Sequence, residues 1–319
     1  MSGRTENYSA VIGIELAGKR LDQALAALFP DFSRSRLQQW LKEGLVTLDG
    51  RTCKAKEKVV GGERVQLEAH LDDQVACVPQ EIPLDVLYED GEILVINKPV
   101  GLVVHPAAGN PDGTLQNALL HHSPDLIQLP RAGIVHRLDK ETSGLLVVAK
   151  TTGAHRSLIE QLQAREIKRE YRALVMGVMT AGGTVDEPIG RHPVHRIRMA
   201  VVHSGKPAVT HYRVLERFRA HTYLKVNLET GRTHQIRVHM AHIRHPLVGD
   251  PLYGGRFRIP AGASPGLIEA LRGFRHQALH ARALGLEHPK TGEWMEWKAP
   301  LPEEFESLLL KMREDAADE

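Results

Sequence analysis

The sequence predicts an α+β protein whose larger part contains a mixed, largely antiparallel sheet. From Leu84 onward, apolar runs of strand length and stretches of helical periodicity do not alternate strictly, as a series of parallel βαβ units would require. A polar segment containing prolines precedes Leu84, and a short basic unit precedes that segment. The chain has 319 residues, of which 42% are hydrophobic, which is enough for one large domain and one small one.

Residues 1–70 are predicted to form a small α/β domain with a core at about residues 17–68. Its first helix has leucines at helical spacing. Its second helix can begin after Ser33, a favourable N-cap, and end at Gly44, a residue type common at helix C-termini. The apolar positions that define the two helices are Leu21, Leu25 and Leu28, and Leu37, Trp40 and Leu41.

A hairpin and a strand complete this predicted domain. The dipeptide Asp49-Gly50 is typical of a two-residue hairpin turn, and the following stretch RVQLE alternates like a strand. Between Gly18 and Gln66 there are ten lysines and arginines and six acidic residues, an excess of four, whereas the whole chain has a formal net charge of +2. The positive charge is therefore concentrated in this domain.

Residues 71–83 are polar, contain two prolines and show no period, so we expect a linker there, followed by a domain at residues 84–319. Residues 255–266 are rich in Gly and Pro and are expected to form a surface loop. The tail, residues 303–319, has seven acids and two bases and is expected to be a short amphipathic helix that frays into solvent. The strands expected in this domain are residues 92–99, 144–150, 169–177 and 222–229, and the helices are 153–167 and 233–244, the latter with Thr233 as its cap.

Composition excludes several classes of protein. A binder that relies on electrostatic attraction alone would carry more positive charge than +2. Cys53 and Cys77 form no metal-binding or disulfide framework, which suits a reducing compartment. No apolar run is long enough to span a bilayer, and the N-terminus lacks an apolar signal core. We therefore expect a soluble cytoplasmic protein, acting as a monomer and without a membrane partner.

The stretch AGIVHRLDKETSGLLVVAK, residues 132–150, places Asp139 between Arg137 and Lys140. Nearby cations lower a carboxyl pKa by about 1–3 units, so this carboxylate stays ionised. An ionised and oriented carboxylate can act as a nucleophile or base at a sugar carbon. On this stretch alone, however, a loop aspartate in an ordinary ion pair is the simpler interpretation.

Neighbouring motifs change that balance. The chain contains, in order, EDGEILVINKPVGLVVHP, HRLDKETSGLL, KREYRAL and LETGRTHQIRVHMAHIRHPLVGDPLYGG. Together they resemble the motifs of pseudouridine synthases of the large-subunit rRNA type, over almost the whole chain. The earlier stretch RLDQAL…FSRSRLQQWLKEGLVTLDGR…GERV resembles the S4-type RNA-binding module, which precedes the catalytic domain in many members of that family.

This resemblance implies a reaction. The N-glycosidic bond of a uridine is broken, the uracil turns, and it is rejoined to the ribose through carbon 5. The sum is an isomerisation, so no redox cofactor, ATP or metal is required. The implied substrate is 23S rRNA, in the large ribosomal subunit or its precursor, at clustered uridines in the loop of helix 69.

The resemblance also implies roles for individual residues. Asp139 is the catalytic carboxylate, which either attacks the anomeric carbon or removes a ribose proton to give a glycal; the sequence does not separate these routes. Arg237 is its basic partner, with Arg232 as the second choice. Tyr171 stacks on the uracil and helps to remove its carbon-5 proton. The remaining residues implied to bind substrate are Arg137 in the gap left by the flipped base, Ile236 in the pocket floor, Lys98 of the first motif, and Arg34, Arg36, Lys42 and Arg51 on the phosphates.

Other interpretations remain open at this stage. The basic residues of the first domain could be an ordinary solvated helix face. The chain could be an RNA-binding ribosome-assembly factor that acts without catalysis. A hydrolytic metalloenzyme is a third class, because His239, His242 and His245 have a spacing compatible with a helical metal site. HExxH is absent and no carboxylate joins these histidines, so we expect no metal.

Overall fold

The computed structural model describes residues 4–30, 32, 34–71, 77–107, 109–195, 197–256 and 258–317. The chain divides into two compact units, Met1–Ala76 and Cys77–Glu319. Part of the predicted linker, residues 72–76, and the predicted cap Ser33 lie outside the described residues. Within the ranges given above, no helix is long and apolar enough to cross a membrane.

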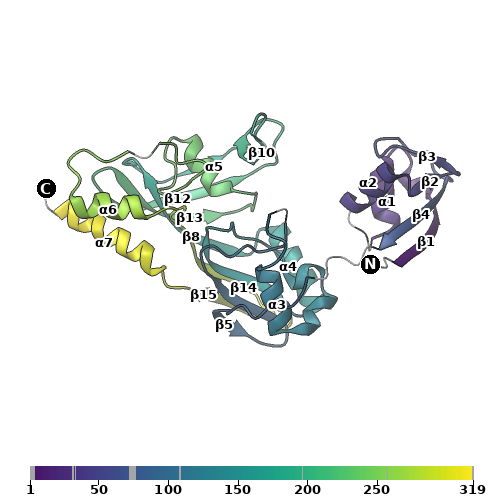
Figure 1. Cartoon of the computed structure of the whole chain (residues 1–319), viewed down its shortest axis with the longest axis horizontal. Helices are drawn as coiled ribbons and strands as arrows, with labels where there is room; N and C mark the ends of the chain where they lie inside the picture. Colours follow the sequence, from purple (N-terminus) through teal and green to yellow (C-terminus); the bar gives the residue numbers. More distant parts are fainter. Residues whose placement is uncertain are drawn as a thin grey trace. The chain divides into compact units, whose positions relative to one another are not determined.

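The first unit is a four-stranded antiparallel sheet, in the order β1-β4-β2-β3, with two helices (Figure 1). Asp49 and Gly50 both have positive φ angles, 50° and 77°, so they form the predicted hairpin turn. Strand β1 was not predicted from the sequence. The elements are β1 (Arg4–Val11), η1 (Ile14–Leu16), α1 (Leu21–Leu28), α2 (Arg34–Glu43), β2 (Val46–Leu48), β3 (Arg51–Thr52) and β4 (Arg64–Leu71).

The second unit is built on a nine-stranded sheet in the order β5-β6-β7-β14-β8-β13-β12-β9, with β15 paired to β14 (Figure 1). Among the described strands of this sheet, β7 and β14 form the one parallel pair, which confirms the predicted mixed, largely antiparallel α+β fold. The strands are β5 (Val86–Glu89), β6 (Ile93–Lys98), β7 (Ser143–Ala149), β8 (Lys168–Met176), β9 (Gly183–Asp186), β12 (Val209–Arg217), β13 (His221–Leu228), β14 (Leu279–Glu287) and β15 (Trp294–Lys298), with a separate pair β10 (Ile189–Arg191) and β11 (Met199–Val201).

Strands β6 and β7 contain continuous apolar runs, residues 93–96 and 145–149, because both faces of each strand are covered. On one face, Leu94 and Leu146 belong to the same apolar cluster as Leu115 of α3. On the other face, Val95 belongs to a second cluster with Leu158 of α4. Burial on two faces explains why these strands read as continuous apolar runs. The helices of this unit are α3 (Leu115–His122), η2 (Pro124–Gln128), η3 (Pro130–Gly133), α4 (Thr152–Ala164), α5 (Gln235–His242), α6 (Pro265–Gly273) and α7 (Glu303–Ala317).

Three sequence expectations are corrected by the helices. Helix α5 is capped by His234, not Thr233, because the backbone of His234 turns into the left-handed region. Helix α6 begins at Pro265 and so shortens the predicted loop. The tail does not fray into solvent: α7 packs Phe305 and its apolar neighbours against α6, and Asp315 near its end is buried and accepts hydrogen bonds.

Gly144 permits the parallel contact between β7 and β14. Its φ angle is +112°, and a Cβ built on it would lie 2.3 Å from the carbonyl oxygen of Ala281. Ala281 is its register partner across the sheet. No other residue type combines this backbone conformation with this close approach.

We therefore predict that Gly144→Ala destabilises the second unit more than Gly292→Ala does. Gly292, between β14 and β15, also has a positive φ but has no atom within 4 Å of a built Cβ. The control should lose about 1–2 kcal/mol from backbone strain, and Gly144→Ala about 1–3 kcal/mol more from overpacking. Urea unfolding followed by circular dichroism measures both; equal losses would contradict the steric argument.

Candidate active site

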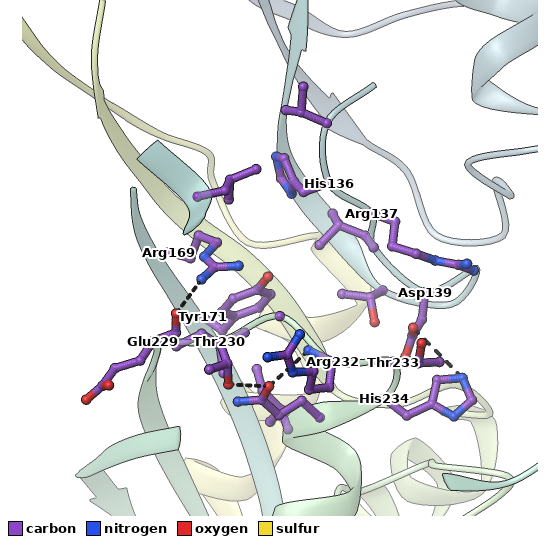
Figure 2. A pocket seen from close by; sticks show the side chains of 18 of the residues that line it. His136, Arg137, Asp139, Arg169, Tyr171, Glu229, Thr230, Arg232, Thr233 and His234 are labelled. Atoms are coloured by element: carbon purple, nitrogen blue, oxygen red, sulfur yellow. Dashed lines mark hydrogen bonds and ion pairs between the residues drawn. The ribbon is translucent and has the colours of Figure 1, made fainter. Parts of the chain in front are cut away.

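A pocket of about 590 Å³ opens where the loop before β7, strand β8 and the start of α5 meet (Figure 2). Asp139 comes from that loop, Tyr171 from β8, and Ile236 and Arg237 from α5, and all four line the pocket. The sheet brings these segments together although Asp139 and Arg237 lie 98 residues apart along the chain. The pocket therefore unites the three residues to which the sequence assigned a catalytic role.

Arg237 connects two carboxylates. Its Nη1 donates to Oδ2 of Asp139 at 2.9 Å, while its Nε and Nη2 donate to the two oxygens of Asp250 at 2.8 and 3.0 Å. Asp250 is fixed in turn by the backbone N–H groups of Leu252 and Tyr253. Burial opposes the charge of Arg237, but Asp250 and then Asp139 raise its pKa above the usual value. The guanidinium is thus a permanently charged and rigid support for Asp139.

His234 lies on the other side of the same carboxylate. Its Nε2 is 3.9 Å from Oδ1 of Asp139, and its Nδ1 is 2.9 Å from the hydroxyl of Tyr253. That hydroxyl accepts a hydrogen bond from the N–H of Met199, so its own proton is free for the histidine. Burial lowers the pKa of His234, while Asp139 opposes that shift. Asp139 is therefore enclosed by two basic groups and remains 17% exposed toward the pocket.

Tyr171 and Ile236 supply the flat and apolar part of the pocket. Tyr171 is 7% exposed and Ile236 4%. Burial raises the pKa of the Tyr171 hydroxyl. An almost fully buried ring at the edge of a pocket is suited to stacking on a planar ligand.

Arg169 and His136 lie on the side of the pocket away from Asp139 (Figure 2). One Nη of Arg169 donates to the carbonyl oxygen of Glu229 at 3.0 Å. His136 accepts a hydrogen bond at Nε2 from the N–H of Val147, and burial lowers its pKa to about 3, so it is neutral.

The other predicted residues of this unit differ in position. Arg137 lines the pocket and is exposed. Arg232 also lines it, but its Nε donates to the carbonyl of Pro207, so of the two arginines considered as partners of Asp139 it is Arg237 that makes the contact. Lys98 does not line the pocket. It is 1% exposed, and its Nζ donates to the carbonyls of Pro99, Leu102 and Lys140.

This position corrects the interpretation of Lys98 as a substrate-binding residue. All three donors of its ammonium group are used by backbone carbonyls, and burial lowers its pKa to about 8. One of the carbonyls belongs to Lys140, the residue after Asp139. Lys98 therefore holds the chain that carries Asp139.

The three histidines considered as a metal site, His239 and His242 on α5 and His245 after it, do not converge. Both ring nitrogens of His239 are engaged, by the Thr210 hydroxyl and the Glu187 carbonyl, and His245 contacts the carbonyl of Met176. His242 is exposed. Across the described part of the chain, no group of three His, Cys, Asp or Glu side chains could hold a metal ion.

In the first unit, three of the four predicted phosphate contacts have partners. Arg34 donates to Asp22, a carboxylate with no exposed surface, and Arg51 pairs with Glu57. Arg36 lies 5.1 Å over the ring of Trp40. Lys42 is exposed at the end of α2. The Arg34 side chain is still 46% exposed, so its pairing leaves it within reach of solvent.

Sequence reasoning missed Asp250, His234, Tyr253 and Arg169. Asp250 and Tyr253 lie within the quoted stretch HPLVGDPLYGG, where a carboxylate next to glycine and proline indicates a turn rather than a site. Only the fold brings Asp250 beside Arg237. Arg169 could have been predicted from the sequence. It lies two residues before Tyr171 on the same strand, so both side chains share one face of the sheet.

Comparisons with known proteins agree with this arrangement. The family model described as RNA pseudouridylate synthase matches residues 92–242, and the S4 domain model matches residues 19–65. A protein of Yersinia pestis named ribosomal large subunit pseudouridine synthase D is 60% identical over 311 residues, which cover 97% of this chain and 96% of that protein. A protein of the same name from Pseudomonas aeruginosa is 60% identical over 307 residues, 96% of each chain.

Among solved structures, human RNA pseudouridylate synthase domain containing 4 is similar, with a TM-score of 0.56 and 28% identity, over 72% of this chain and 93% of that one. Because the bacterial relatives match over nearly their whole length and both family models lie in the expected order, the chain belongs to the RNA pseudouridine synthase family and has an S4 domain ahead of the region that matches the synthase model.

Proposed function

We propose that this enzyme converts uridines of large-subunit rRNA to pseudouridine, with Asp139 as the catalytic carboxylate. The observation that carries the proposal is the carboxylate of Asp139, held 2.9 Å from Nη1 of Arg237 at the edge of a pocket that also contains Tyr171. The bacterial relatives named for the large ribosomal subunit support the rRNA substrate. Such a substrate places the reaction in the bacterial cytoplasm.

The chemistry follows from the position of Asp139. The target uridine leaves its stack and enters the pocket, where its ring packs between Tyr171 and Ile236. Asp139 then attacks the anomeric carbon or takes a ribose proton, and the N1–C1′ electron pair leaves with the uracil. The ring turns and carbon 5 bonds to C1′. On the nucleophilic route this breaks the Asp139–C1′ bond, and on the glycal route Asp139 returns its proton to the ribose. The carbon-5 proton is then removed with help from Tyr171, and N1 takes up a proton. Every atom of the substrate is retained, so the chain's own side chains suffice for the balance.

Arg137 and Arg232 bind the flanking RNA in this account. Arg137 is exposed at the mouth and can fill the gap left by the flipped base, which lowers the cost of unstacking. The target implied by the resemblance, the loop of helix 69, suits this step, because loop uridines cost less to extract than paired ones.

Asp139→Asn should abolish pseudouridine formation while RNA binding stays nearly intact, because the amide keeps the shape but cannot act as an anionic nucleophile or base. Two measurements check this: turnover of purified protein on rRNA, and a map of pseudouridines in rRNA from cells with the wild-type gene, the variant or neither. Turnover within tenfold of wild type, or the variant restoring the modification, would exclude Asp139 from catalysis.

Tyr171→Phe should keep stacking but slow turnover, whereas Tyr171→Ala should lose both. The ring alone can stack, at about 1–3 kcal/mol per base, while only the hydroxyl can assist proton removal. Comparing the rates of both variants under saturating RNA separates these roles. A fully active Phe variant would leave the hydroxyl without a chemical role.

The S4 domain should supply affinity rather than chemistry, through Arg34, Arg36, Lys42 and Arg51. Deleting residues 1–70 should weaken binding to rRNA and flatten its salt dependence, yet allow turnover at high RNA concentration. In the full chain, Lys42→Gln with Arg51→Gln should reduce the salt slope by about 2. The control is Lys311→Gln, an exposed lysine paired with Glu314 on α7. An unchanged affinity and slope would show that the domain is not the RNA anchor.

A further inference from the structure

Arg169 is a buried cation without a carboxylate. The residue is 8% exposed, and its Nε has no hydrogen-bond partner. Within the described ranges, no carboxylate lies at ion-pair distance from it. Glu229 offers Arg169 its backbone carbonyl, while the Glu229 carboxylate is bound by Arg165 at 2.8 Å and His211 at 2.7 Å.

The other buried lysine and arginine side chains among the described residues of this unit are compensated. Arg237 has two carboxylates, and Lys98 has three carbonyls. Burial lowers the pKa of Arg169; Tyr171 opposes that shift, and Arg232, a neighbouring cation, adds to it. A buried guanidinium remains ionised but is costly to desolvate without an opposite charge. The region around Arg169 therefore has an excess of positive charge that an anionic ligand would offset.

The geometry directs that charge into the pocket. Arg169 and Tyr171 are two residues apart on β8, so their side chains project from the same face, and both line the pocket (Figure 2). A Cβ at Gly231 would lie 2.8 Å from Nη1 of Arg169, so the backbone there packs directly on the guanidinium. The cation is thereby held beside the ring that, in the proposed function, stacks on the uracil.

The proposed reaction produces an anion at this place. When the N1–C1′ bond breaks, its electron pair leaves on the uracil, and the charge spreads from N1 to the two exocyclic oxygens. We infer that Arg169 binds the detached uracil anion, with its free N–H groups donating to an exocyclic oxygen. This rests on the proposed function and adds a residue to it: Asp139 acts on the sugar, and Arg169 stabilises the leaving base. Arg169 stays in place while the ring turns. The negative charge of the uracil is lost when carbon 5 bonds to C1′.

The test compares leaving groups. Single-turnover rates are measured for wild type, Arg169→Gln and Arg169→Lys on one RNA that contains uridine or 5-fluorouridine at the target, as loss of the original N-glycoside. Fluorine stabilises the detached anion. The matched control is Arg172→Gln, on the same strand but the opposite face, where the arginine is paired with Glu170.

Arg169→Gln should slow cleavage of uridine by about 100-fold, the typical cost of one lost donor to a developing anion. Its loss on 5-fluorouridine should be only about tenfold, because a base that stabilises its own charge needs less help. The Lys variant should recover part of the rate, and the affinity for RNA should change less than threefold. The control should show equal, small effects on both substrates.

Three outcomes would overturn the inference. An equal loss on both substrates would mean that Arg169 only supports the fold. A weaker RNA affinity with an unchanged cleavage rate would make it a phosphate contact. A wild-type rate for the Gln variant would leave it without a role. Failure of the proposed function is separate, because it would appear as activity in Asp139→Asn on either substrate.

Discussion

One guanidinium shared by two carboxylates is the interaction on which the site depends. Asp250 accepts hydrogen bonds from Nε and Nη2 of Arg237. This pairing fixes the orientation of the guanidinium, so that Nη1 donates to Asp139. Burying these charges is costly. The cost is offset because each nitrogen of the guanidinium donates to a carboxylate oxygen at 2.8–3.0 Å and the backbone N–H groups of Leu252 and Tyr253 donate to Asp250. The result is an oriented carboxylate whose remaining exposed surface faces the pocket.

The sheet makes this interaction possible. Asp139 precedes β7, and Tyr171 lies on β8, which is separated from β7 by β14 alone. Gly144 allows β14 to approach β7 closely, and Lys98 holds the backbone beside Asp139 through the Lys140 carbonyl. Gly144 and Lys98 do not line the pocket, but both help to position the carboxylate of Asp139.

The parts of the fold that followed from sequence are those with local causes. Strands β6 and β7 contain continuous apolar runs, residues 93–96 and 145–149, and the turn at Asp49-Gly50 needs positive φ angles that this dipeptide adopts easily. Tertiary contacts decided the rest. The N-cap of α5 is His234 rather than the expected Thr233. Helix α7 does not fray because its apolar face packs against α6. For the site, the sequence motifs predicted Asp139 and Arg237. The residues next to Asp250 in the sequence give no indication that it lies beside Arg237 in the fold.

If Asp250 acts through Arg237 to orient Asp139, removing its charge should impair turnover without touching the substrate. Asp250→Asn and Asp315→Asn each remove a buried carboxylate that accepts a hydrogen bond from an arginine Nε. Asp315, on α7, pairs with Arg219 and does not line the pocket, so it serves as the control. Under saturating RNA, Asp250→Asn should lower turnover by about 10–100-fold through misplacement of the reacting group, with RNA affinity unchanged, while Asp315→Asn affects stability alone. Equal turnover in the two variants would contradict the account.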